Sequence, residues 1–152
     1  MASEPDGRAA VDTWEELNTH TVKAALRWNK RIVERREEYV DAGDQQAQIA
    51  FRVQALEQAI DSAAMIQIET AEGSVTLDLG MQFHLDRQVK CDDSVLAEYG
   101  RHVAAPMLIS YLRGALTSEC QTMGWQNMIL PPTVEDSLRR MSDERILGQS
   151  EA

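Results

Sequence analysis

The chain has 152 residues, a net charge of −10 and an apolar content of 43%, values typical of a single globular domain spanning residues 1–152. An acidic surface argues against nucleic acid as a partner, because phosphate groups bind to basic proteins. The two cysteines lack CxxC spacing, no apolar run resembles a signal peptide, and none approaches the ~20 residues of a membrane span. We therefore expect a cytoplasmic protein that does not insert into membranes.

The N-terminal residues predict a tail followed by a helix. Residues 1–10 are small and polar and are expected to be flexible, as are residues 148–152. Asp12 or Thr13 can cap a helix whose first turn is acidic and whose apolar residues follow at helical spacing. This pattern predicts an N-terminal helix over residues 12–28.

Two segments fit a helix as well as a strand. In residues 27–42, apolar positions recur every seven residues, which favours a helix, although others could face one side of a β-ribbon. In residues 47–60, apolar positions alternate from Ile49 to Val53 but keep helical spacing from Ile49 to Ile60. The pattern by itself favours a helix in both segments without deciding the question.

An antiparallel hairpin over residues 64–85 is the clearest element. Short alternation precedes the turn sequence AEGS, and six apolar residues then alternate strictly with polar ones. The apolar residues are Val75, Leu77, Leu79, Met81, Phe83 and Leu85. The opposite face is expected to be solvated and carries Thr76, Asp78, Gln82, His84 and Asp86.

Helices are predicted in the C-terminal half. Asp93 or Ser94 can cap one helix, which Pro106 interrupts or restarts. Residues 106–123 carry an apolar stripe wider than one sheet contact needs, so a second helix or subunit is expected to cover part of it. Gly124 ends this helix, and a short helix is predicted over residues 133–147.

No pattern in the sequence indicates catalysis. There is no P-loop, no GxSxG, no HExxH and no GxGxxG after a strand. His84 with Asp78 and Asp86 suggests at most a weak metal site. The alternation of the strand explains better why these polar residues share one face. Cys120 lies in an apolar stripe and predicts an inert thiol. We expect no enzyme activity, no catalytic residue, no metal and no cofactor.

The stretch LISYLRGALTSECQTMGWQNMILPPTVEDSL resembles the C-terminal half of SecB, the cytosolic export chaperone, and of its SecB-like relatives. The family pattern joins Tyr-x-Arg, a Thr-Ser pair, a glycine with an aromatic residue, an apolar extended stretch and an acidic helix start. The matching residues are Leu108, Tyr111, Arg113, Thr117, Ser118, Gly124, Trp125, Leu130, Pro132, Val134 and Asp136. The resemblance covers residues 75–140. Two features differ from the family: Ser110 replaces the proline before the tyrosine, and strongly charged segments replace the first strands.

The resemblance implies an α+β fold: an antiparallel sheet of about four strands with two helices packed on one face, plus the N-terminal helical extension. Residues 31–42 and 47–59 would then occupy the first two strand positions. It also implies a homotetramer that acts as an ATP-independent chaperone and holds unfolded precursor proteins ready for export. The translocation ATPase SecA would be a further partner. The alternatives are a chaperone of a toxin–antitoxin system, or a helical adaptor or assembly protein.

The same resemblance assigns residues to sites. An extended apolar segment after Gly124 would border a groove for unfolded clients, with Phe83, Trp125 and Met128 as contacts. Asp78 falls where the family has an acidic group on the sheet face that docks the partner ATPase.

Overall fold

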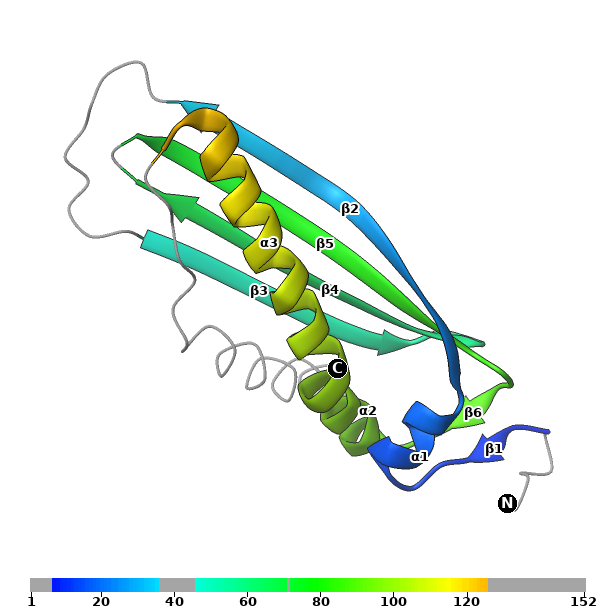
Figure 1. The fold of residues 1–152 in the computed structure, drawn as a ribbon. Coiled ribbons are helices and arrows are strands. Elements are labelled where there is room, and N and C mark those ends of the chain that lie inside the picture. Colours follow the sequence, from blue (N-terminus) through cyan, green and yellow to red (C-terminus); the bar gives the residue numbers. More distant parts are fainter. Residues whose placement is uncertain (1–6, 36–45, 71, 126–152) are drawn as a thin grey trace.

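The computed structural model describes residues 7–35, 46–70 and 72–125, and its centre is a four-stranded antiparallel sheet in the order β2-β5-β4-β3 (Figure 1). The strands are β2 (Thr21–Arg35), β3 (Gln46–Ala55), β4 (Ala59–Glu69) and β5 (Gly73–Leu85). Strands β2 and β3 are therefore the two edges. This confirms the α+β fold and the antiparallel sheet of four strands.

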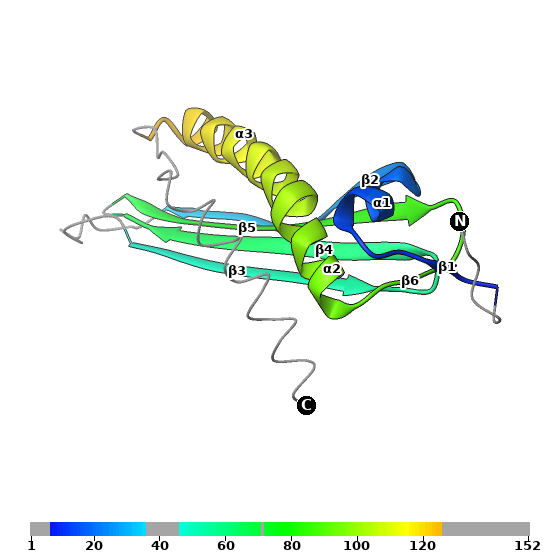
Figure 2. The ribbon, with the colours of Figure 1, turned by 90° about the horizontal axis from the view of Figure 1, so that it is seen from below.

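The strict alternation after the AEGS turn produces the central strand β5. Its six apolar residues are all buried and lie on one side of the sheet, here called the inner face. Helix α3 packs on this face (Figure 2). The other side, the outer face, carries the polar residues of β5, as predicted. The hairpin begins earlier than expected, because β4 extends back to Ala59 and pairs with β5 up to His84.

The predicted helix over residues 12–28 is wrong beyond its first turns. Helix α1 spans only Trp14–Thr19, and β2 begins at Thr21. The cap is confirmed at Thr13, whose Oγ1 accepts the backbone N–H of Glu16 at 3.2 Å. Pairing along the whole of β5 outweighs the local helical preference, since tertiary contacts override propensity.

A β-bulge explains why the apolar residues of β2 do not alternate as in a regular strand. The register shifts between Trp28 and Lys30. Before the shift, Leu26 and Trp28 lie opposite inner-face residues of β5, and after it Val33 does. One extra residue therefore moves the inner face from even to odd positions and breaks the alternation.

The helical interpretation of residues 47–60 is also wrong, and the strand position implied by the resemblance is confirmed. Strand β3 ends at Ala55, and a turn leads into β4, closed by a 2.8 Å bond from the N–H of Leu56 to the carbonyl of Ala59. Leu56 and Ile60, which complete the helical spacing, thus belong to the turn and to the next strand.

The helices after the sheet form one continuous rod. Helix α2 (Asp93–Tyr99) passes through a π-helical turn, η1 (Gly100–Ala104), into α3 (Ala105–Met123). Pro106 lies in the first turn of α3, directly after the π-helical turn, so it does not interrupt the rod. Gly124 ends the helix in the left-handed conformation (φ 69°), as predicted.

The segment expected to be a flexible tail contains a short strand. Strand β1 (Ala9–Ala10) pairs in parallel with β6 (Val89–Lys90) and places Ala9 in a buried position. The predicted helix over 133–147 and the tail over 148–152 lie outside the described residues.

Candidate functional site

Strand β3 presents an open sheet edge with little charge. Within residues 7–35, 46–70 and 72–125, no strand pairs with its outer side. Its sequence QAQIAFRVQA contains one charged residue, Arg52. On the inner face, Phe51 and Val53 are buried while Ile49 is half-buried. An extended polypeptide can add to such an edge through main-chain hydrogen bonds and bring its own side chains against Ile49.

Strand β2 is the other edge of the sheet and, unlike β3, carries many charged residues. It is longer than β3 and densely charged along both faces. The charged residues are Lys23, Arg27, Lys30, Arg31, Glu34 and Arg35. Charges on an edge strand disfavour indiscriminate pairing with other chains. A partner at this edge must therefore be matched to it.

An apolar groove runs between β2 and α3. It encloses about 350 Å³ and is lined by Trp28, Arg31, Ser110, Tyr111, Gly114, Ala115 and Ser118. A Cβ added at Gly114 would meet nothing within 4 Å, so the floor there is open. The Tyr111 side chain is 49% exposed, and Leu26 and Met107 nearby are 39% and 36% exposed. These are large apolar groups that one chain leaves in contact with water.

An arginine is fixed at the side of this groove. The Arg31 guanidinium lies 4.9 Å from the ring centre of Trp28, and its Nε donates to Oε1 of Glu119 at 2.6 Å. The stacking holds the indole in place. The β2–α3 groove is thus preformed, with apolar walls and one oriented charge.

The sheet itself covers most of the wide apolar stripe of α3. Six of its residues are buried within this one chain, namely Leu108, Ile109, Leu112, Ala115, Leu116 and Cys120. The flank with Met107 and Tyr111 stays exposed. The prediction of a buried Cys120 is confirmed.

The predicted client contacts lie mainly in the core. Phe83 is 2% exposed and packs edge-on against Tyr99, with ring centres 5.4 Å apart. A surface contact through Phe83 is therefore corrected to a core role: it occupies an inner-face position of β5 beneath the helical rod. Met128 lies outside the described residues.

Trp125 pins the end of α3 to the sheet. It is 7% exposed, its backbone N–H donates to the carbonyl of Cys120 at 2.9 Å, and its indole lies over Gly73. A Cβ on Gly73 would approach the Trp125 ring to 2.6 Å, so only glycine admits the indole. The buried Nε1 has no hydrogen-bond partner among the described residues.

Asp78 lies on the outer face as expected. It is half-buried, faces Lys30 across the ladder and accepts a bond from Nδ2 of Asn29 at 3.4 Å. Asp86 does not join His84. Its Oδ1 instead lies 2.8 Å from Nδ1 of His20, a side chain that is buried at the end of α1.

The described segments carry neither a metal-binding cluster nor a membrane-spanning helix. They contain no group of three or more histidine, cysteine, aspartate or glutamate side chains arranged for a metal ion. Among their helices, none is both long enough and apolar enough to cross a membrane.

Sequence reasoning did not single out the β2–α3 groove or the β3 edge. Trp28 and Leu26 were assigned to a helix, and Tyr111 was noted only as part of a motif. The available signal was the mixture of large apolar and charged residues in β2, which suits an edge strand with a partner.

The comparisons with known proteins concern the fold. No protein-family model and no curated protein matches the chain. Among solved structures, the chain is similar to the SecB-like chaperone Rv1957 of Mycobacterium tuberculosis, solved in complex with a ChAD peptide from the HigA1 antitoxin. The TM-score is 0.61 at 11% identity, over 77% of this chain and 90% of that one. A protein of unknown function from Streptococcus agalactiae matches at a TM-score of 0.44 and 10% identity, over 72% of this chain and 97% of that one. The chain has a SecB-like fold.

Proposed function

We propose that the protein is an ATP-independent molecular chaperone that holds unfolded or precursor proteins in the cytoplasm. The nearly uncharged edge of β3, which no strand covers in the described part of the chain, carries this proposal, together with the likeness of the fold to a SecB-like chaperone. The protein acts by binding alone, with no catalytic residue and no cofactor.

Client binding follows from the chemistry of the β3 edge. Main-chain N–H and C=O groups pair with any extended polypeptide, because every residue except proline carries both. Partly exposed apolar side chains such as Ile49 add burial without demanding a sequence. Affinity that comes from backbone pairing and apolar contact needs no nucleotide and suits many clients.

The charged β2 edge and the β2–α3 groove serve assembly. A second copy would cover Tyr111, Met107 and Leu26 and would pair with the main-chain N–H and C=O groups at the edge of β2. Such contacts would build the homotetramer that the sequence resemblance implies. Sedimentation of the parent should give a tetramer mass. Tyr111→Lys should give a smaller species, whereas a parent that is monomeric at micromolar concentration would refute this arrangement.

Export and toxin–antitoxin roles remain two branches of the same activity. Holding precursors for export would involve SecA as a further partner. The solved SecB-like neighbour is bound to an antitoxin peptide, which favours the second branch. A pull-down of the full chain with SecA, and in parallel with antitoxins encoded beside its gene, separates the two.

The test of the chaperone function measures aggregation of a chemically unfolded client by light scattering. The parent should delay aggregation equally with and without ATP. Ala47→Lys with Gln48→Lys places charges at exposed positions of the β3 edge, like those on β2, and should raise the concentration needed at least fivefold.

The matched control adds the same two charges elsewhere. Thr117→Lys with Gln121→Lys, at exposed positions of α3, should protect the client as the parent does. A parent that does not delay aggregation refutes the function. An unimpaired Ala47→Lys, Gln48→Lys variant refutes the β3 edge as the site.

A further inference from the structure

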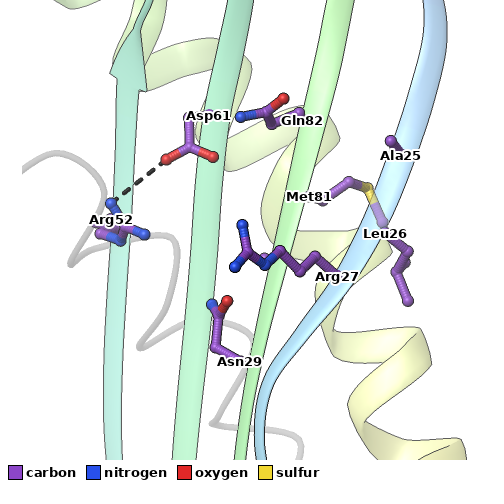
Figure 3. Close-up of a pocket in the computed structure, with 9 residues that line it drawn as sticks. Ala25, Leu26, Arg27, Asn29, Arg52, Asp61, Met81 and Gln82 are labelled. Atoms are coloured by element: carbon purple, nitrogen blue, oxygen red, sulfur yellow. Dashed lines mark ion pairs between the residues drawn. The ribbon is translucent and has the colours of Figure 1, made fainter.

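A row of four residues crosses the outer face of the sheet from edge to edge. Arg27 of β2 lies opposite Gly80 of β5, Gly80 lies opposite Ala63 of β4, and Ala63 lies opposite Arg52 of β3. With a strand spacing of ~4.8 Å, the backbones of the two arginines are about 14 Å apart. Gly80 and both arginines line a hollow of about 310 Å³ (Figure 3).

The two arginines are held differently. Nη1 of Arg52 lies 3.4 Å from Oδ2 of Asp61, and Gln54 donates to the same oxygen at 3.2 Å. The Arg52 side chain is still 54% exposed, so other donors of its guanidinium face solvent. Arg27 forms no ion pair with any residue that the structure describes, and Figure 3 shows its side chain reaching across β5 toward β4.

The surroundings of the hollow are basic, unlike the molecule as a whole. Lys23 and Lys30 lie on the same face of β2, so four basic side chains stand against two acidic ones, Asp61 and Asp78. The whole chain has a net charge of −10. Charge here is complementary to an anion, whereas the resemblance assigned Asp78 to a docking surface for the partner ATPase.

We propose that this hollow binds the carboxylate side chains of an acidic segment in a partner protein. A guanidinium presents paired N–H donors that match the two oxygens of a carboxylate, and two such groups flank the hollow. Gly80 has no side chain, which lets a peptide approach the sheet closely there. A short acidic peptide is favoured over nucleic acid, because the net charge of the chain repels a long polyanion. The site is separate from the β3 edge and does not depend on the chaperone function.

The test uses fluorescence anisotropy with the full chain and a labelled decapeptide of alternating glutamate and serine. The protein should bind this peptide, and neither the glutamine nor the lysine version of it. Arg27→Gln and Arg52→Gln should each weaken binding at least fivefold, and binding should weaken as salt is added. Gly80→Val fills the hollow without changing the charge and should also weaken binding.

The control removes an equal charge away from the hollow. Arg113→Gln, at an exposed position of α3, should leave binding unchanged. Circular dichroism should show all variants folded. The proposal is overturned if Arg27→Gln and Arg52→Gln bind as the parent does, or if Arg113→Gln weakens binding equally. Tighter binding of the lysine peptide, or of a single-stranded oligonucleotide through the same two arginines, would also overturn it.

Discussion

Replacing Trp125 by alanine tests whether this residue is a structural pin or a client contact. The indole is 7% exposed and packs over Gly73 at the start of β5, where a Cβ would lie 2.6 Å from its ring. Truncating a buried tryptophan to alanine typically costs 3–5 kcal/mol. The unpartnered Nε1 is itself unfavourable in the core, so we expect the lower end, about 3 kcal/mol. For a chain of this length, that loss lowers Tm by ~6–12 °C.

The assay is urea unfolding followed by far-UV circular dichroism, which does not depend on the deleted fluorophore. Trp14→Ala is the matched control, because Trp14 is half-buried and stacks on His102 with ring centres 4.6 Å apart. Trp14→Ala should lower the free energy of unfolding clearly less than Trp125→Ala. If Trp125→Ala unfolds within ~0.5 kcal/mol of the parent, the pin is refuted. Reduced client protection at unchanged stability would make Trp125 a client contact after all.

Three further predictions concern ionisable side chains. Burial raises the pKa of Tyr99 to about 12, and the hydrogen bond to Thr21 opposes this shift. The folded state therefore keeps a phenol proton that the unfolded chain releases above pH ~10. The parent should therefore lose up to about 3 kcal/mol between pH 10 and 12, and Tyr99→Phe clearly less, in urea titrations at pH 9 and 11.5; equal losses would contradict this. Burial and, to a smaller extent, the neighbouring aspartates raise the pKa of Cys91. Iodoacetamide at pH 8 should therefore alkylate Cys91 several-fold more slowly in the folded protein than in the urea-unfolded chain. Equal rates would show an unperturbed thiol. Asp86→Ala removes the partner of Nδ1 of the buried His20 and should cost about 1–3 kcal/mol in urea unfolding, with an unchanged midpoint arguing against the bond.

The elements that could be predicted from sequence are those whose pattern has one period. Strand β5 alternates from Val75 to Leu85 without a break, and α3 keeps one apolar stripe up to the glycine that ends it. In both, one face is buried along its full length, so the period in the sequence reports the geometry directly.

Strand β2 could not be predicted because two of its features imitate a helix. Leu26 and Val33 are seven residues apart, an odd spacing that places residues on opposite faces of a regular strand. The bulge at Trp28 returns both to the inner face, and a seven-residue repeat is also a helical signal. Its many charged residues reflect an exposed edge rather than the solvated face of a helix.

The burial of Phe83 and the exposure of Tyr111 depend on packing between elements. Phe83 was chosen as a client contact although its place in the alternation of β5 already indicated the core, and the structure places it there. Tyr111 is exposed because it lies at the edge of the contact between α3 and the sheet, where it lines the groove with Trp28 and Arg31 of β2. That boundary depends on the packing of distant elements, which no local pattern contains.

The two edges of the sheet differ in charge, and the proposed function uses this difference to separate assembly from client binding. A chaperone that holds extended chains must keep one edge open, yet two open edges would let copies of the protein polymerise into a continuous sheet. Six charged residues and a shaped apolar groove restrict β2 to a matched partner, whereas β3 carries only Arg52 and restricts little. If copies assemble through β2, the assembly is closed at that edge and β3 faces outward for clients. Under the proposed function, the uneven charge of the two strands is therefore the feature that would let one sheet serve both purposes.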